Sequence, residues 1–176
     1  MRNCWRIDIS RTVVAYEQTK EQAARRGLDV GKIAPEGEGA FLLQYEAGLA
    51  AGDGYKVRAP LSRSRGAISF ACGIPEGATI RITESDAPSQ VSSALEAARQ
   101  AKERLGGRPA AGALVFDCIC RNLILGEHFA NAVSGIAREL GDVPIAGFET
   151  YGEVAMDAGD MSGFHNTTSV VLAFPK

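Results

Sequence analysis

The sequence predicts a mixed α+β or α/β fold, in which two main helices pack on a mixed, largely antiparallel sheet. One observation behind this prediction is a series of short β-rich runs between residues 41 and 83, separated by glycine-containing turns. The other is a pair of segments with helical periodicity, 89–105 and 125–140, with an apolar strand between them. The 176 residues fit one domain.

The first half of the chain predicts one helix followed by an antiparallel sheet. A short strand is expected at 12–16, and a helix at 17–26, where good helix formers precede Gly27. Residues 28–40 are rich in glycine and polar groups and predict a loop. Further strands are predicted at 41–46, 55–59, 67–72 and 79–83.

The second half predicts alternating helices and strands. The helix at 89–105 has an apolar stripe at helical spacing, and the helix at 125–140 ends at Gly141. Between them, 112–120 is almost continuously apolar, which is typical of a strand buried on both faces. Two more strands are predicted at 143–150 and 167–174.

The composition excludes several classes of protein. A net charge of −2 argues against bulk nucleic-acid binding, which needs a basic face. No apolar run reaches the roughly 20 residues that span a bilayer, and residues 1–9 do not resemble a signal peptide. We therefore expect a cytoplasmic protein without membrane insertion. A bridge between Cys118 and Cys120 would be strained, so the four cysteines are expected to be reduced.

Polar side chains follow the ends of the C-terminal strands. Cys118–Arg121 and Gly147–Glu153 each end an apolar run, and Gly163–Thr168 precedes the last one. Ligand clefts in layered structures form at strand ends. We therefore expect these three segments to converge on one polar recess.

These segments resemble the C-terminal half of the FIST sensory domain. The resemblance rests on Leu114–Cys118 with Arg121 and Gly126, on Gly147–Glu153, and on Phe164–Thr168. The earlier stretches Val57-Arg58, Gly66–Phe70 and Ile74–Gly77 are similar to the front part of the same half-domain.

The resemblance divides the chain into an N-terminal extension or remnant at 1–30 and a FIST C-terminal-like domain at 31–176. It implies a bacterial sensory module for signal transduction that binds a small molecule, such as an amino acid-like ligand. The partners that it implies are that ligand and either a signalling partner domain or an N-terminal FIST half, which nothing in this sequence resembles. Some relatives bind haem and sense nitric oxide.

Seven residues are the candidate ligand site. Arg121 has two interpretations, a clamp for a ligand carboxylate or a tie that binds loop carbonyls. Glu153 either holds a ligand ammonium or caps backbone, and His165 is a structural donor, a ligand contact or a haem axial ligand. Cys118 is either a packed small hydrophobe or a contact in the site. The remaining candidates, expected to line the pocket, are Thr150, Tyr151 and Asn166.

No catalytic motif supports an enzyme. The sequence has no phosphate-binding loop and no His-Glu-x-x-His pattern, and the adjacent Asp117 and Cys118 point to opposite faces of a strand, which weakens any triad. No metal or cofactor is expected, with haem through His165 or His128 as the exception. The sequence leaves three hypotheses, which are a ligand-binding sensor, a protein-interaction scaffold without ligand, and a haem-based nitric oxide sensor.

Overall fold

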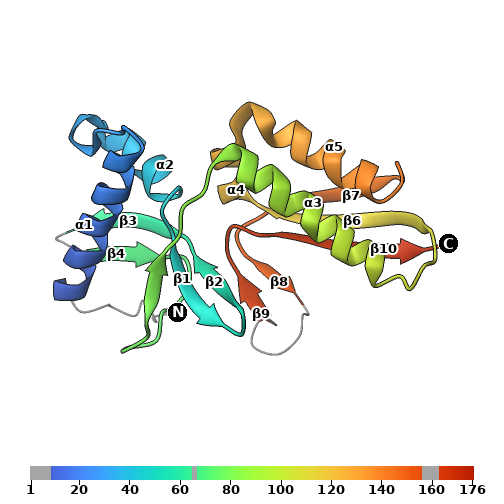
Figure 1. Cartoon of the computed structure of the whole chain (residues 1–176), viewed down its shortest axis with the longest axis horizontal. Coiled ribbons are helices and arrows are strands. Elements are labelled where there is room, and N and C mark those ends of the chain that lie inside the picture. Colours follow the sequence, from blue (N-terminus) through green and yellow to red (C-terminus); the bar gives the residue numbers. More distant parts are fainter. Residues whose placement is uncertain (1–8, 65–66, 156–162) are drawn as a thin grey trace. The chain divides into compact units, whose positions relative to one another are not determined.

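The computed structural model describes residues 9–64, 67–155 and 163–176, which form a mixed fold of helices and short sheets (Figure 1). Of the strand pairs described, all are antiparallel except β6 with β7, so the predicted α+β, largely antiparallel fold is confirmed. The strands are divided among several small sheets rather than one. None of the described helices combines the length and the hydropathy needed to cross a membrane.

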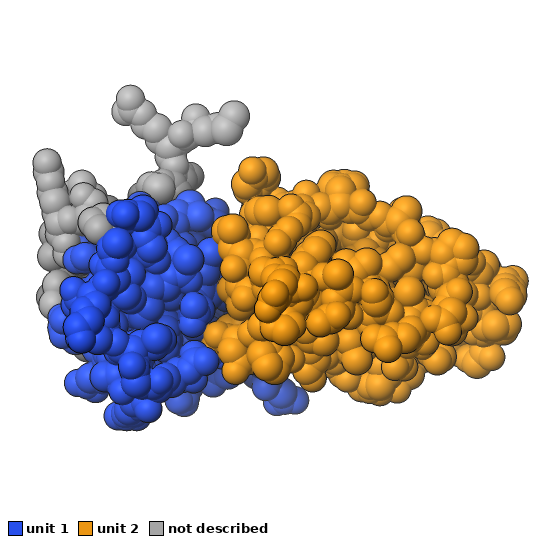
Figure 2. Space-filling model, turned by 90° about the horizontal axis from the view of Figure 1, so that it is seen from above, with its two compact units in different colours: residues 1–84, 159–161 blue, residues 85–158, 162–176 orange. Residues whose placement is uncertain are grey.

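Two compact units make up the chain (Figure 2). Unit 1 comprises residues 1–84 and 159–161, and unit 2 comprises residues 85–158 and 162–176. The sequence predicted a division near residue 30, and that division stays a prediction. Each unit is described below by itself.

Helices of unit 1 enclose a small apolar cluster. Ala23 from the long first helix packs with Phe41, Leu42 and Tyr45. The first helix ends before Gly27, which has φ +78°, a left-handed conformation that glycine adopts at little cost. The helical elements are α1 (Ile9–Arg25), η1 (Val30–Lys32), η2 (Pro35–Gly37) and α2 (Glu38–Leu42).

Two predicted strands of unit 1 are wrong, because 12–16 lies in a helix and 41–46 is the end of a helix with the turn that follows it. Residues 12–16 lie within α1, since no turn residue separates their β-branched run from the strong helix formers that follow. Residues 41–46 were predicted as a strand, but Phe41, Leu42 and Tyr45 stand at helical spacing, and α2 with the turn after it directs them into one cluster.

The remaining strands of unit 1 form an antiparallel sheet of order β2-β1-β5 and a separate β3-β4 hairpin. The strands predicted near 55–59, 67–72 and 79–83 are confirmed. The strand at Ala47–Ala51 was not predicted, because its Ala- and Gly-rich sequence resembles a turn. Glycine suits position 48 of this strand, since a Cβ there would lie 3.0 Å from Thr83 Cγ2. The bounds are β1 (Ala47–Ala51), β2 (Gly54–Arg58), β3 (Pro60–Ser64), β4 (Ala67–Phe70) and β5 (Ile80–Ile82).

Unit 2 is built on a three-stranded sheet of order β10-β6-β7, with α3 and α5 on one face (Figure 1). Ala94 and Ala98 from α3 meet Ile136 from α5 and Val115 from β6 in its core. The helical elements are α3 (Ala87–Glu103), α4 (Ile119–Leu125), η3 (Gly126–His128) and α5 (Phe129–Glu139). The strands are β6 (Ala110–Cys118), β7 (Ile145–Thr150), β8 (Glu153–Ala155), β9 (Gly163–His165) and β10 (Ser169–Pro175).

Both predicted helices of unit 2 are confirmed, but the second is shorter than predicted. A separate short helix, α4, continues directly from β6, and the chain turns at Gly126, which has φ +52°. The helix α5 therefore begins at Phe129.

The prediction that 112–120 is a strand buried on both faces is wrong. The strand β6 ends at Cys118, and its burial alternates: Val115 and Asp117 are buried on the helix side, whereas Leu114 is exposed. On the side opposite the helices, Phe116 and Phe148 meet edge to face, with ring centroids 5.4 Å apart. Among the described residues, helices cover only one face of this sheet. The side chains of β6 are therefore alternately buried and more exposed, whereas the sequence predicted that all of them are buried.

Candidate functional site

A buried ion pair joins the end of β6 to the start of α4. Arg121 is only 1% exposed, and its Nε donates to Asp117 Oδ1 at 2.5 Å. Its Nη1 donates to the side chains of Gln90 and Ser93, and its Nη2 to the Gln90 carbonyl at 2.9 Å. The guanidinium thus ties α3 to α4 and β6, and this geometry favours the structural interpretation of Arg121 over a ligand clamp.

A second buried charge, Glu153 on β8, lies beside this pair. Glu153 is 2% exposed and accepts hydrogen bonds from Thr150 Oγ1 and from Thr168, whose Oγ1 is 2.8 Å away. Thr150 Oγ1 also lies 3.3 Å from the carbonyl oxygen of Asp117. Thr150 therefore connects the Asp117 backbone to the Glu153 carboxylate. On the neighbouring strand β9, His165 is the cross-strand partner of Glu153.

Three of the predicted site residues, Arg121, Thr150 and Glu153, share this network, and His165 is paired with Glu153. Arg121, Glu153, His165, Asn166 and Cys118 are buried, and Thr150 is half-buried. The hydrogen bonds given above for Arg121, Thr150 and Glu153 are made within the protein, at the ends of β6 and β7 and the start of β8. Tyr151 is different, because it is 90% exposed.

The two neighbouring cysteines differ in acidity. The Cys118 thiol donates to the Cys120 sulfur, and this bond, with a further bond from Thr167, lowers the pKa of Cys120 to about 7. The same bond and burial raise the pKa of Cys118. Cys72, Cys118 and Cys120 are free, as expected, while Cys4 lies outside the described residues.

Asp117 has an unusual environment for a carboxylate. It is 3% exposed, and burial raises its pKa, with a further contribution from Glu153, although Arg121 opposes the shift. Its second oxygen, Oδ2, is buried and has no hydrogen-bond partner among the described residues. Buried polar atoms are rarely left without a partner, so this oxygen calls for an explanation.

Asp117 also lines a cavity of about 180 Å³ between β6, β7 and α5. Apolar side chains form most of its wall, and its two charged lining residues are Asp117 and Glu149. These two carboxylates occupy paired positions on the parallel strands β6 and β7. Glu149 accepts a hydrogen bond from the Asn122 amide, which carries no charge. The apolar wall comprises Val115, Phe129, Val133, Ile136 and Ile145, among others.

The close approach of β6 and β7 beneath this cavity requires a glycine. A Cβ at Gly147 would lie 1.9 Å from the carbonyl oxygen of Val115, well inside van der Waals contact. Any larger residue would push the strands apart and displace Glu149, two positions further along.

Comparison with known families identifies the chain. The family model described as the FIST C domain matches residues 16–156, most of the chain. The chain belongs to the FIST C domain family. This match confirms the predicted resemblance. The FIST C domain is a sensory and signal-transduction family. No curated protein and no solved structure was found to match.

The FIST C match covers some site residues and not others. Arg121, Asp117, Glu149 and Glu153 lie inside the matched range, as do all residues that line the cavity. His165 lies beyond it, as do Asn166 and the strand β10. The part of the site that belongs to the FIST C match is therefore the cavity with the ion pair beside it.

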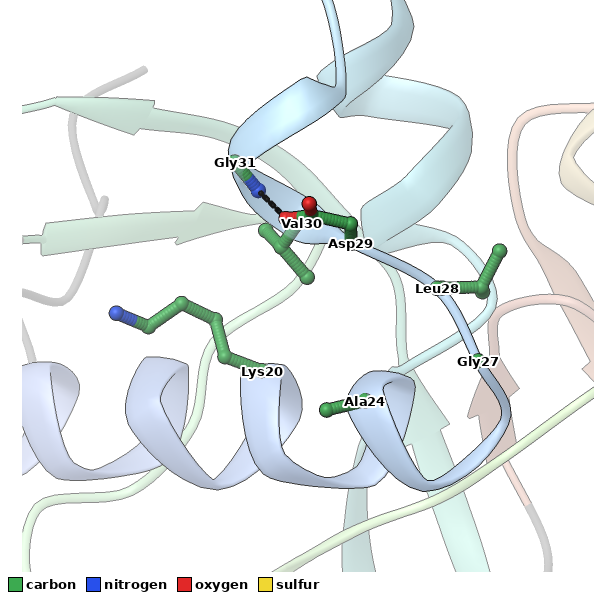
Figure 3. A pocket seen from close by; sticks show the side chains of 7 residues that line it. All are labelled: Lys20, Ala24, Gly27, Leu28, Asp29, Val30 and Gly31. Atoms are coloured by element: carbon green, nitrogen blue, oxygen red, sulfur yellow. Dashed lines mark hydrogen bonds between the residues drawn. The ribbon is translucent and has the colours of Figure 1, made fainter.

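Unit 1 of this FIST C protein has a larger, more open hollow of about 460 Å³ (Figure 3). In Figure 3, Lys20 and Ala24 on α1 lie opposite the turn from Gly27 to Gly31. Asp29 Oδ1 accepts from the Gly31 amide at 3.1 Å, and Lys20 pairs with Glu17. These polar groups are on the surface and already have partners, so this hollow gives no argument for a ligand.

The sequence predicts no metal for the FIST C site and leaves haem as one hypothesis, and both stay predictions. Among the residues that the structure describes, no three or more His, Cys, Asp or Glu side chains are placed to hold a metal ion. His165 is buried on β9, and His128, near Asn131, lies just before α5. Neither position tests the haem hypothesis.

Sequence analysis missed Gln90, Ser93 and Glu149, and it assigned Asp117 no role in binding. A signal for two of them was present in the paired segments Val115-Phe-Asp-Cys118 and Gly147-Phe-Glu-Thr150. On adjacent parallel strands, this Phe-acid repeat places both phenyl rings on one face and both carboxylates on the other.

Proposed function

We propose that this FIST C protein is a small-molecule sensor whose ligand binds in the cavity between β6, β7 and α5. The observation that carries the proposal is the position of Asp117. Its side chain lines the cavity with one oxygen lacking a partner, while its other oxygen is bound to Arg121. A mostly apolar cavity with a few converging polar groups is the usual form of a small-molecule site.

The network beside the cavity offers a route from binding to response. A ligand that bonds to Asp117 Oδ2 changes the charge facing Arg121, which holds α3 through Gln90. The Asp117 carbonyl is also linked through Thr150 to Glu153 on β8. Ligand binding would then bias the packing of α3 and β8, and a signalling partner domain or an N-terminal FIST half would detect the bias.

The proposal assigns binding rather than catalysis to the site. Cys118, the nucleophile considered from the sequence, is buried, and its pKa is raised, which disfavours the reactive thiolate. The guanidinium of Arg121 already donates to protein groups, and this supports a ligand in the cavity rather than on an arginine clamp.

Thermal-shift screening of a small-molecule library tests this function. Ligands in excess should raise the melting temperature of the full chain by mass action. The same ligands should have no effect on Val133→Phe, which fills the cavity from α5, and should keep their effect on Val30→Phe, which alters the wall of the unit 1 hollow. Equal shifts in wild type and Val133→Phe would place the ligand elsewhere and refute the proposal.

A further inference from the structure

We infer that the cavity selects a small organic monocation, with an ammonium or amidinium head group and an apolar body about the size of one ring. This inference rests on the proposed function, because it names the class of ligand for the same site. It follows from the charges at the cavity, from the unpartnered oxygen of Asp117 and from the size and chemistry of the wall.

The charges that line the cavity are negative. Asp117 and Glu149 stand side by side on neighbouring strands, and the cation bonded to them is Arg121, which binds Asp117 Oδ1. Glu149 is bonded to a neutral amide from Asn122. The pair therefore keeps about one negative charge, carried by the exposed Glu149, that a single bound cation would neutralise.

The unpartnered oxygen indicates what kind of atom is missing. A carboxylate oxygen accepts hydrogen bonds, so Asp117 Oδ2 lacks a donor. A ligand ammonium supplies that donor together with a positive charge, and charge-assisted bonds of this kind are stronger than neutral ones. An alcohol supplies a donor without the charge, and a carboxylate ligand supplies neither.

The size and the wall of the cavity limit the rest of the ligand. A cavity of about 150 Å³ in another protein accepts benzene, so about 180 Å³ suits one ring or a short branched chain. Phe129, Val133 and Ile136 from α5 face Ile145 from β7 across this space. A fully polar cation would leave this apolar wall without contacts.

The described residues that line the cavity include no cation that could pair with an anionic or zwitterionic ligand. Arg121, which binds Asp117 at the cavity wall, already donates to Asp117, Gln90 and Ser93. A ligand carboxylate would meet Asp117 and Glu149 instead, and like charges at short range repel.

Calorimetric titration of the full chain with three matched probes tests the inference. The probes are benzylamine, benzyl alcohol and benzoate, which share one ring and differ in charge. We expect benzylamine to bind at least about tenfold more tightly than benzyl alcohol, and benzoate to show no binding. The preference should disappear in Asp117→Asn and shrink in Glu149→Gln, which retains an oxygen for the Asn122 amide, and persist in Glu127→Gln, whose side chain lies outside the cavity wall.

Several outcomes would overturn the inference, and they are distinct from failure of the proposed function. Benzyl alcohol or benzoate binding as tightly as benzylamine would leave a sensor with a different ligand class. The inference would also be wrong if none of the three probes bound while library ligands still raised the melting temperature of wild type but not of Val133→Phe. That result would again leave a sensor with a different class of ligand. If Asp117→Asn does not fold, an undiminished amine preference in Glu149→Gln would count against the inference.

Discussion

The hollow of unit 1 and the cavity of unit 2 differ in the state of their polar groups. The unit 1 hollow is larger, at about 460 Å³ against about 180 Å³, but Lys20 and Asp29 on its rim have partners on the surface. The unit 2 cavity is smaller, yet Asp117 at its wall is buried, and its Oδ2 has no hydrogen-bond partner within the described part of the chain. The difference teaches that incomplete hydrogen bonding of a buried charge, rather than volume, marks the candidate site.

Two buried arginines extend the contrast. In unit 1, Arg58 donates to the carbonyls of Gly73 and Val57, which are neutral acceptors in a loop and a strand. In unit 2, Arg121 donates to a carboxylate that also borders a cavity. Both arginines hold the backbone in place, and Arg121 also binds a residue of the cavity wall.

The largest expected effect is on Arg121. Arg121→Ala leaves Asp117 buried without its cation, and breaking a buried pair typically costs about 3–5 kcal/mol of unfolding free energy. The control Arg138→Ala removes an exposed arginine of α5 and should stay within about 0.5 kcal/mol of wild type. Urea unfolding measures both. Similar small losses in the two variants would show that the Arg121 pair does not hold unit 2 together.

A pair of glycine substitutions sharpens the comparison at the level of the backbone. Gly147→Ala should lower the unfolding free energy by roughly 2–4 kcal/mol, because the new methyl group would clash with the Val115 carbonyl. Gly39→Ala in α2 of unit 1 meets nothing within 4 Å and should raise stability by about 0.4–1 kcal/mol. Thermal unfolding of both variants gives opposite signs if the packing is as described, and a neutral Gly147→Ala would contradict it.

The free thiols of the two units allow a third comparison. Alkylation of Cys120 by iodoacetamide should reach half its maximal rate near pH 7, because the bond from Cys118 lowers its pKa to about 7, below the roughly 8.5 of an ordinary thiol. The Cys120→Ser variant should lose the alkylation that has its midpoint near pH 7, while Cys72→Ser in unit 1 should keep it. A pH midpoint at or above about 8.5 would contradict the assigned environment.

The smallest expected effect is a change in pH dependence. Burial raises the pKa of Asp117, so the folded chain holds this proton more tightly than the unfolded chain does. The contribution of Asp117 to stability is therefore greatest below its ordinary pKa of about 3.9 and falls as pH rises through the raised value. The charged groups nearest to it, Arg121, Glu153 and Glu149, are unchanged in Asp117→Asn.

Urea unfolding between pH 4 and pH 8 checks this sign. Relative to Asp117→Asn, wild type should lose stability as pH rises over the lower part of that range. A wild type that instead gains stability relative to the variant would mean that pairing with Arg121 outweighs burial.

The sequence predicted the fold class correctly and predicted candidate site residues, but it did not predict how those residues are bonded. Helical spacing from 89 to 105 predicted α3 correctly because its apolar stripe is regular and its end is set by two glycines. Local patterns failed at 12–16 and 41–46, where neighbouring helix formers and a shared core decided the conformation.

The candidate site shows the same limit. Arg121 and Glu153 were found from their place after strands, and both lie in the network. The Arg121 partners Gln90 and Ser93 lie about 30 residues earlier in the chain, and only the packing of α3 brings them to Arg121. The cavity depends on the parallel register that sets Asp117 beside Glu149, which no local pattern specifies.

Amide chemical shifts recorded during titration with benzylamine test the central claim most directly, because they report which hollow is occupied. The account predicts saturable shift changes at the cavity wall, over 129–136 and 145–149, with smaller changes at Glu153 and none over 20–31. Shift changes confined to 20–31, or spread evenly over the chain without saturation, would contradict it.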